Sequence, residues 1–297
     1  MSMNEYQIGV TRELPHSLLV GARYVRKSII RTIEDVGVLV PGVGEVFYIA
    51  NPGEGISLSL MDPSIPGFPE VTRDYDALEL TAEKRFSNRW QLFANYTLSR
   101  LYGNYSGLAS SDEDGRTAPN VNRFFDNILN TFDRNAEPVL GRLGTDRPHS
   151  FKAQVLYQTK FDMSVGVTQR LASGIPISEE ANAAGGVPFF PFGRGNLGRT
   201  DIWNQTDLQL VQRVRLSRYA LEFSAVILNL FDNDLVTRVY NNRTTGNLPL
   251  DTEDFFAGGW DYNTLIAQNP GILDAKYNQP DQFLAPREIR LGVKFTF

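Results

Sequence analysis

The sequence predicts an all-β chain that forms a segment of a transmembrane antiparallel β-barrel. Three observations support this prediction. Short segments alternate between apolar and polar residues, very short turns alternate with long loops along the 297 residues, and the chain ends on an aromatic residue. Alternation with a period of two residues is typical of a strand with one apolar and one polar face. The pattern is clearest in the last strand and recurs throughout the chain.

The last strand is expected over residues 287–297. Its apolar positions are Ile289, Leu291, Val293, Phe295 and Phe297, and its polar positions include Arg290 and Lys294. An edge strand of a soluble sheet could alternate in the same way. Outer-membrane barrels, however, carry girdles of aromatic residues at the membrane interfaces, and their last strand closes the wall. We therefore expect the five apolar residues to form a barrel-assembly signal for the barrel-assembly machinery.

Eight further strands are expected in four pairs, each pair joined by a short turn. The pairs are 4–12 with 18–27, 75–85 with 90–100, 150–158 with 163–171, and 203–213 with 219–231. Long connections rich in Gly, Pro, Asn and Asp separate the pairs and are expected to lack regular structure; they cover 28–74, 101–149, 172–202 and 232–286. A compact soluble domain seldom carries four such loops. Short periplasmic turns and long extracellular loops are typical of outer-membrane barrels.

The alternation also predicts which way the side chains face. We expect one set to face lipid: Leu80, Leu92, Val155, Phe223 and Leu291. We expect a second set to face the lumen: Glu79, Glu83, Gln91, Lys152, Arg213, Glu222, Arg290 and Lys294. Aromatic residues fall into two bands, Trp90, Tyr157, Tyr219 and Phe297 near the short turns and Tyr6, Tyr24, Tyr75, Tyr96 and Phe151 near the long loops. Two such bands match the two interfaces of a bilayer.

The composition excludes several classes of protein. A formal net charge of −5 argues against a nucleic-acid-binding surface. No run of eighteen apolar residues is present, so no transmembrane helix is expected. The absence of cysteine fits a chain that crosses an oxidising compartment. The strand pattern begins at residue 4 without a basic and apolar leader, so we expect no signal peptide in this sequence.

Catalytic, metal and cofactor sites are not expected. His16 lies in a short turn, and Ser150 points to the opposite face of a strand from its neighbour His149. The acidic stretch 112–115 resembles a calcium loop, but Arg116 follows it and no bidentate Glu stands at the required spacing, which favours a solvated loop. The glycines at 185–186 and 193–195 lack the Lys-Ser/Thr or βαβ context of a phosphate-binding loop. We therefore expect a protein that is not an enzyme.

Two groups of apolar loop residues remain. Phe124, Phe125, Ile128, Leu129 and Phe132 repeat at helical spacing, which favours a short helix packed on the core of its own loop over a partner-binding helix. Clustered aromatic residues with polar neighbours are favoured at recognition surfaces. The candidate ligand-binding residues are Phe189, Phe190, Phe192, Phe255, Phe256, Trp260 and Tyr262. The alternative is that these aromatic residues pack the loops against each other.

Several segments resemble a known family. Residues 229–233, followed by a long loop and a terminal strand ending at Phe297, resemble the end of a TonB-dependent receptor. Residues 4–15, 22–26, 47–53 and 143–149 are similar to the Oar-like branch, whose members carry a carboxypeptidase-regulatory-like domain ahead of the plug.

The resemblance implies a barrel of about 22 strands around a plug. Residues 1–297 then form its C-terminal portion, without the plug and the N-terminal domain. Implied partners are outer-membrane lipid, an unknown ligand, and the TonB complex through the missing N-terminal parts. The charged residues that face the lumen would either contact the plug or line the translocation path, or they would only be hydrated by water in the lumen. Two alternatives remain, a small standalone outer-membrane barrel and a secreted soluble β-sandwich that binds carbohydrate.

Overall fold

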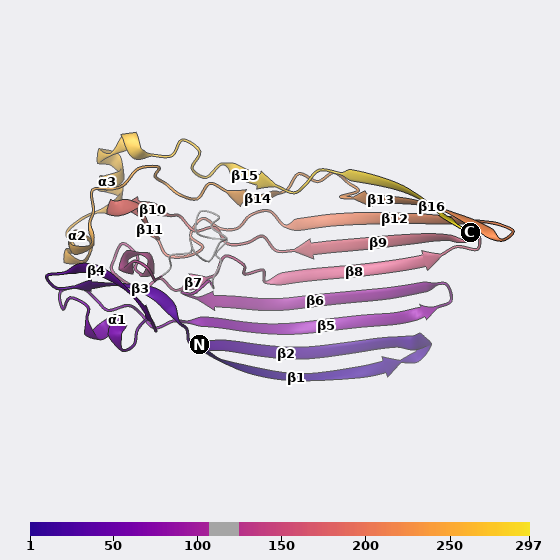
Figure 1. Cartoon of the computed structure of the whole chain (residues 1–297), viewed down its shortest axis with the longest axis horizontal. Coiled ribbons are helices and arrows are strands. Elements are labelled where there is room, and N and C mark those ends of the chain that lie inside the picture. The colour runs from indigo at the N-terminus through magenta and orange to yellow at the C-terminus, as the bar shows by residue number, and fades with distance from the viewer. Residues whose placement is uncertain (107–124) are drawn as a thin grey trace.

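The computed structural model describes residues 1–106 and 125–297, and one large antiparallel sheet dominates it (Figure 1). Nine strands follow one another across this sheet in sequence order. They are β1 (Ser2–Leu14), β2 (Leu18–Arg31), β5 (Arg73–Ser87), β6 (Trp90–Gly103), β8 (His149–Gln158), β9 (Met163–Ala172), β12 (Trp203–Leu216), β13 (Tyr219–Leu228) and β16 (Glu288–Thr296). The short β7 (Gly141–Arg142) extends the sheet beside β6. All nine predicted strands are therefore present, and the predicted fold class is confirmed.

The predicted strand 219–231 is three residues too long, because β13 ends at Leu228. The next residue, Asn229, has a left-handed backbone with φ of 50°. Its side-chain amide donates to the carbonyl oxygens of Asn233 and Ala285, and its backbone N–H donates to the carboxylate of Asp207. These bonds turn the chain out of the sheet, and asparagine tolerates this backbone conformation better than most residues.

Short turns join the paired strands at one end of the sheet (Figure 1). The turn between β5 and β6 has Asn88 and Arg89 as its central residues, with φ of 49° and 70°. Two successive residues with positive φ are typical of the type I′ turn, whose twist matches that of the flanking strands. The ammonium of Lys84 closes this turn, because it donates to Ser87 Oγ at 2.7 Å and to the carbonyl oxygen of Trp90 at 3.2 Å. It also lies 4.3 Å from the centroid of the Trp90 ring.

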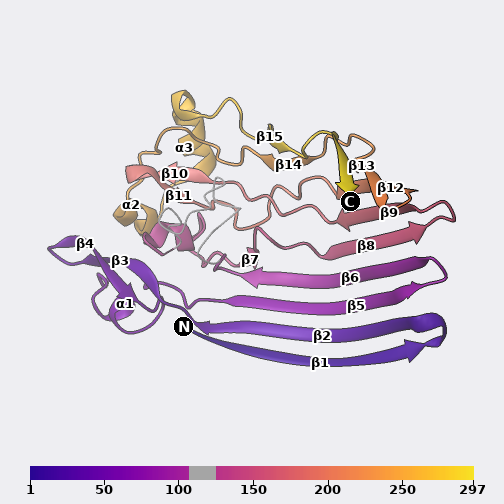
Figure 2. The ribbon, with the colours of Figure 1, turned by 45° about the vertical axis from the view of Figure 1, so that its right-hand side comes forward.

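The long connections are not structureless, so that part of the prediction is wrong. They contain β3 (Glu34–Val40), β4 (Gly44–Ala50), α1 (Ile56–Ser59), η3 (Ile128–Thr131), β10 (Ala181–Ala183), η4 (Ala184–Gly186), β11 (Val187–Phe189), β14 (Val236–Val239), α2 (Thr252–Ala257), α3 (Tyr262–Gln268), η5 (Pro270–Ile272) and β15 (Pro280–Phe283). These elements gather at the end of the sheet opposite the short turns (Figures 1 and 2). We call them together the loop cluster.

The main hydrophobic core lies in the loop cluster. Its buried residues come from all four connections and include Val36, Phe68, Phe125, Leu248 and Phe255. The loops are long enough to bury their own apolar side chains against each other. Local alternation along the sequence does not reveal this packing between loops. Within the segment of helical spacing, Ile128–Thr131 form a 3-10 turn that is buried in this core. The predicted packing on the core of the loops is therefore confirmed. Phe124 lies outside the described residues.

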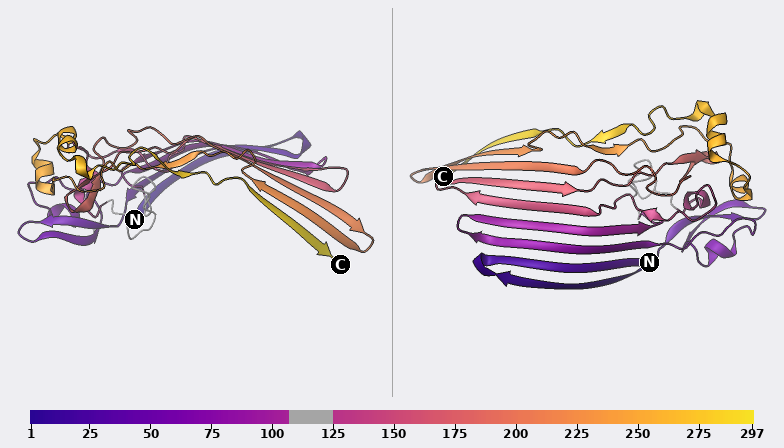
Figure 3. Two further views of the ribbon diagram at one scale, coloured as in Figure 1. Left: turned by 90° about the horizontal axis from the view of Figure 1, so that it is seen from above. Right: turned by 180° about the vertical axis from the view of Figure 1, so that it is seen from behind.

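The sheet is twisted and curved, and its two edges are β1 and β16 (Figure 3). Among the described strands, each of these two pairs with a single neighbour. No second sheet packs on the apolar face of the large sheet in the described residues, which contradicts the alternative of a β-sandwich. None of the helices in the described ranges has the length and apolar character needed to cross a membrane.

Candidate functional site

The strand register sorts the predicted side chains onto the two faces of the sheet. In an antiparallel sheet, directly opposed residues point to the same side. Leu92 opposes Val155, Val155 opposes Val167, and Phe223 opposes Val293, and the same parity extends to Leu80 and Leu291. These residues therefore lie on one face, which we call the apolar face. Their side chains are half-exposed to fully exposed in the described structure, with Leu291 81% exposed.

The opposite face, here the polar face, carries every residue predicted to face the lumen. They are Glu79, Glu83, Gln91, Lys152, Arg213, Glu222, Arg290 and Lys294. Four ion pairs between strand residues lie there: Lys27 with Glu5 at 3.2 Å, Arg23 with Glu79 at 2.5 Å, Arg213 with Glu222 at 2.9 Å, and Arg290 with Glu288 at 2.6 Å. Most charges of this face are therefore compensated by neighbours.

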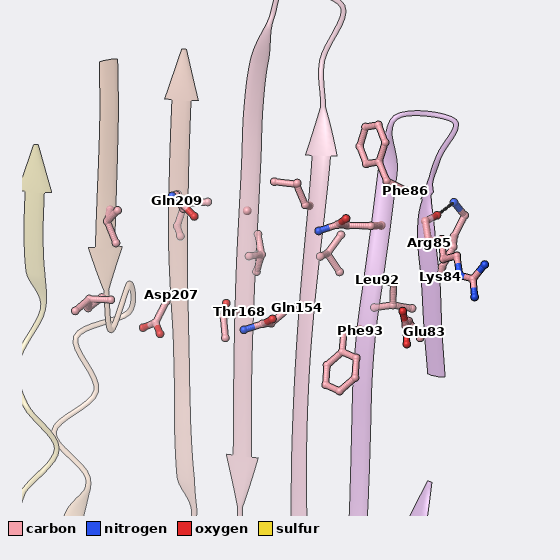
Figure 4. Close-up of a pocket in the computed structure, with 18 residues that line it drawn as sticks. Glu83, Lys84, Arg85, Phe86, Leu92, Phe93, Gln154, Thr168, Asp207 and Gln209 are labelled. Atoms are coloured by element: carbon pink, nitrogen blue, oxygen red, sulfur yellow. Dashed lines mark hydrogen bonds between the residues drawn. The ribbon is translucent and has the colours of Figure 1, made fainter. Parts of the chain in front are cut away.

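A shallow cavity of about 640 Å³ lies against the middle of the polar face (Figure 4). Phe93 and Gln154 oppose each other in the register, as do Gln154 and Thr168. Asp207 and Gln209 of β12 complete the far side (Figure 4). Asp207 is already engaged, because it accepts from the N–H of Asn229 and from the amide of Gln205. The cavity thus presents the rings of Phe86 and Phe93 among neutral, acidic and basic groups, the basic ones from Lys84 and Arg85.

Two smaller cavities lie nearer the loop cluster. One, of about 290 Å³, is lined by residues that include Lys27, Arg73 and Arg147. The other, of about 270 Å³, is lined by Arg147, Lys152, Arg170 and Trp203 among others. Basic side chains therefore gather on the polar face beneath the loop cluster, with Asp146 among them in the first of these two cavities.

The predicted ligand-binding aromatic residues are mostly buried, which corrects the expectation that they are exposed. Phe189, Phe190, Phe255 and Tyr262 are each at most 3% exposed. Phe189 meets the rings of Phe255 and Tyr262 edge to face at 5.5 and 6.2 Å. Such pairs stabilise a core beyond the area they bury. Phe256 packs on Phe132 at 5.2 Å.

The other two predicted aromatic residues lie nearer the surface of the loop cluster. Phe192 is the more exposed of them, and the guanidinium of Arg134 lies 4.4 Å from its ring centroid. Trp260 is half-buried, and its indole N–H donates to the carbonyl oxygen of Phe255 at 2.9 Å. Of the seven residues, these two and Phe256 have side-chain surface that a ligand could reach in this arrangement.

The buried carboxylate of Glu179 joins the connections 172–202 and 232–286. The sequence pattern did not indicate this contact. Glu179 accepts from the hydroxyl of Tyr262 at 2.8 Å and from that of Tyr277 at 2.7 Å. Burial, together with the adjacent carboxylate of Glu179, raises the pKa of both phenols far above the ordinary range. Each phenol therefore stays protonated and donates. We call Glu179, Tyr262 and Tyr277 the tyrosine clamp.

The histidines do not form a catalytic arrangement in the described structure. His16 lies in the turn between β1 and β2, and Nδ1 of His149 lies 2.8 Å from the hydroxyl of Tyr96 on the apolar face. Within residues 1–106 and 125–297, no three carboxylate or imidazole groups are placed to hold a metal ion. The acidic stretch 112–115 lies outside the described residues.

Comparison with known proteins decides the family. A family model described as "Outer membrane beta barrel domain" matches residues 1–218. The chain belongs to this family. Membership in this outer-membrane barrel family places the chain in the bacterial outer membrane, as its alternating strands predicted.

The match to curated proteins extends over the whole barrel chain. The chain is 29% identical over 315 residues to the TonB-dependent transporter Oar of Myxococcus xanthus, and the alignment covers 100% of this chain and 28% of that protein. The resemblance to the Oar-like branch of TonB-dependent receptors is confirmed. The chain spans about 28% of the length of this curated relative.

Three solved structures are also similar to this barrel chain. The ferric-catecholate import receptor Fiu of E. coli K12 has a TM-score of 0.45 at 18% identity, over 80% of this chain and 24% of that one. The siderophore receptor PiuA of Acinetobacter baumannii has a TM-score of 0.45 at 13% identity, over 80% and 26%. The ferripyoverdine receptor of Pseudomonas aeruginosa has a TM-score of 0.46 at 12% identity, over 81% and 25%.

Proposed function

We propose that this chain forms wall and extracellular loops of a TonB-dependent receptor that binds a ligand outside the cell and transports it inward. The observation that carries the proposal is the division of one continuous sheet into an apolar face and a polar face, with a packed loop cluster at one end. A barrel wall with lipid outside and water inside requires this division. The similarity to the transporter Oar supports the same function.

Under this proposal the apolar face contacts outer-membrane lipid and the polar face lines the lumen. Phe295 of β16 stacks on Tyr219 at 5.5 Å and on Phe297 at 6.0 Å near the short turns. These rings form part of an interfacial girdle. Ile289, Leu291 and Val293 complete an exposed apolar row that suits recognition by the barrel-assembly machinery.

We further propose that the nine strands are one contiguous part of a larger wall. Strands β1 and β16 both run toward the short turns, so direct pairing between them would be parallel, whereas bacterial single-chain barrels are antiparallel. Unpaired strand edges in hydrocarbon cost several kcal/mol for each unsatisfied backbone group. Further strands would satisfy both edges. The plug and the TonB contact would belong to other parts of the receptor.

The proposed role includes no catalysis, no cofactor and no nucleic-acid partner. Ligand contact would fall to the outer rim of the loop cluster, where Phe192 and Trp260 keep accessible surface, while the buried aromatic residues hold the loops in place.

Uptake experiments test the transport proposal. Cells with and without the protein would be compared for depletion of compounds from a defined nutrient mixture, in backgrounds with and without functional TonB. We expect at least one compound to be taken up only when both the protein and TonB are present. Uptake that persists without TonB, or no difference between the strains, would contradict the proposal.

A further inference from the structure

Three cationic side chains gather on the polar face just beneath the loop cluster. Arg147 precedes β8, Lys152 lies on β8, and Arg170 lies on β9. Together with Trp203 they line the cavity of about 270 Å³. Arg147 also lines the adjoining cavity of about 290 Å³ together with Lys27, which pairs with Glu5 at 3.2 Å, and Asp146. We call Arg147, Lys152 and Arg170 the basic cluster.

Two members of the basic cluster oppose each other directly. Lys152 and Arg170 are register partners across β8 and β9, so their side chains point to the same side at close range. Like charges in directly opposed positions destabilise a sheet. Their neighbours along the sheet, Asn95 and Gln205, are neutral and cannot compensate them.

The basic cluster also lacks acidic partners in the part of the chain that the structure describes. None of its three members has a carboxylate within 4.0 Å there. Elsewhere on the same face, Arg23, Arg213 and Arg290 each have one. Unlike these three arginines, the basic cluster is therefore a local excess of positive charge.

Arg147 is held in place before any ligand arrives. Its Nη1 donates to the carbonyl oxygen of Ser173 at 2.6 Å, and its guanidinium lies 5.7 Å from the centroid of the Trp203 ring. Burial and the neighbouring Arg199 lower its pKa from the usual range, so its charge is poorly compensated by its surroundings. A fixed guanidinium beside an aromatic ring is pre-organised for a planar anion.

We propose that the basic cluster binds an anionic group, a carboxylate or a phosphate, of the small ligand that the receptor takes up. This inference rests on the proposed transport function and names the chemical class of its ligand. The guanidiniums of Arg147 and Arg170 suit two-point hydrogen bonding to carboxylate or phosphate oxygens, and Lys152 supplies a third charge. Bound anion would also remove the repulsion between Lys152 and Arg170. The position beneath the loops is where a ligand would arrive on leaving the outer rim.

Calorimetric titration of the protein, extracted in detergent from outer membranes of its host, tests the proposal. The probes are citrate and pyrophosphate, with uncharged sucrose as the negative probe. We expect the two anions to bind with an affinity that falls as salt rises, and sucrose not to bind. Lys152→Gln and Arg170→Gln should each weaken anion binding by about tenfold or more, since a charged hydrogen-bonding partner is lost.

Lys294→Gln is the matched control, because it removes the same charge from the same face near the short turns. We expect it to leave anion binding unchanged. An equal loss in Lys294→Gln, or no anion binding by the unaltered protein, would overturn the proposal. Citrate without pyrophosphate binding would assign the site to carboxylates, and the reverse would assign it to phosphates.

Thermal unfolding of the same samples separates ligand binding from a structural role. Without added anion, Lys152→Gln should unfold at the same or a higher temperature than the unaltered protein, because a like-charge contact is relieved. Citrate should raise the unfolding temperature of the unaltered protein more than that of the variant. A lower unfolding temperature of Lys152→Gln without anion would show that acidic groups elsewhere in the protein already pair with the basic cluster, and would overturn the proposal. Neither assay depends on TonB, so the two failures are distinguishable. Failure of uptake would leave an anion-binding site but remove its assignment to a transported ligand, and failure of anion binding would leave transport standing.

Discussion

Asp146 and Arg199 form an ion pair at the base of the loop cluster, with 2.5 Å between Asp146 Oδ2 and Arg199 Nη2. The Asp146 side chain is fully buried, at 0% exposure. Its other oxygen accepts from the backbone N–H of Leu101 at 2.7 Å. Arg199 Nη1 also donates to the carbonyl oxygens of Asp146 and Gly174. The pair therefore ties the end of β6 to the loops before β8 and after β9.

Replacing Asp146 by asparagine should loosen this end of the sheet. Asparagine keeps the size and the acceptor for Leu101 but leaves Arg199 without its buried counter-charge. Removing one partner of a fully buried pair costs about 3–5 kcal/mol. Because Arg199 is partly exposed, we expect about 2–3 kcal/mol, with faster proteolysis within 101–149 and 172–202. Urea unfolding and limited proteolysis of the extracted protein measure both effects.

Asp162→Asn provides the control for that substitution. Asp162 pairs with Arg215 at 3.4 Å near the short turns, where both side chains are well exposed. Exposed pairs contribute less than about 1 kcal/mol. If the two variants lose equal stability, burial of the Asp146 pair is not what stabilises the loops.

Most of the sheet could be predicted from the sequence, because its information is local. Alternation of apolar and polar residues over about ten residues indicates each strand. Short turns then determine which strands are neighbours, and the parity of positions such as Val155 and Lys152 follows without knowledge of distant contacts.

The loop cluster could not be predicted in this way, because its contacts are distant in sequence. Asp146 meets Leu101 and Arg199 across 45 and 53 residues. Glu179 stands next to Glu180 in a loop and looks like a solvated acidic group, yet its two phenol partners lie 83 and 98 residues away. No period of two or of 3.6 residues marks such contacts, and an aromatic residue in a loop is equally consistent with a buried core and an exposed surface.

The assignment of the two sheet faces predicts a pattern of chemical labelling. The chain has no cysteine, so single cysteines can be introduced one at a time. A membrane-impermeant thiol reagent should label cysteines at Glu79, Gln91, Lys152, Glu222 and Arg290 through the aqueous lumen. It should not label cysteines at Leu80, Leu92, Val155, Phe223 and Leu291. Equal labelling of both sets would exclude a lipid-facing apolar face.

Charge substitution on the apolar face tests the same assignment through stability. Val155→Arg should cost about 2–4 kcal/mol if this residue lies near the bilayer midplane. The adjacent Gln154→Arg places the same charge on the polar face and should cost little. Unfolding by urea in lipid vesicles measures the difference between the two variants. Similar costs for both would count against the bilayer orientation proposed here.

The tyrosine clamp makes the loop cluster sensitive to alkaline pH. In the unfolded chain each phenol has a pKa of about 10. The pKa of Tyr262 and of Tyr277 is raised in the folded protein, so their stabilising contribution is complete below about pH 10 and declines above it until the raised folded pKa is reached. We expect the loop cluster to open above about pH 10 while the large sheet persists. Limited proteolysis across an alkaline pH series monitors this opening.

Tyr277→Phe separates the clamp from general alkaline unfolding. This variant loses one hydrogen bond to Glu179, which costs about 1–3 kcal/mol because the acceptor is charged and largely buried. The loop cluster should then be less stable at neutral pH but should depend less on alkaline pH. Tyr157→Phe, an exposed phenol on β8, should change neither property. An unchanged alkaline response in Tyr277→Phe would locate the sensitivity outside the clamp.

Lys84 is a buried cation on the apolar face, and we expect its ammonium to stabilise the turn between β5 and β6. The side chain is 4% exposed, and its Nζ donates to the carbonyl oxygens of Arg85, Ser87 and Trp90 and to Ser87 Oγ. Lys84→Met keeps the stem but leaves these acceptors unpaired, so stability should fall by about 1–3 kcal/mol. Lys160→Met, at an exposed turn position between β8 and β9, should change stability by less than about 0.5 kcal/mol. Urea unfolding of both variants in detergent provides the comparison. A Lys84→Met protein as stable as the Lys160→Met protein would mean that water replaces the ammonium at no cost and that the I′ turn of Asn88 and Arg89 holds the hairpin by itself.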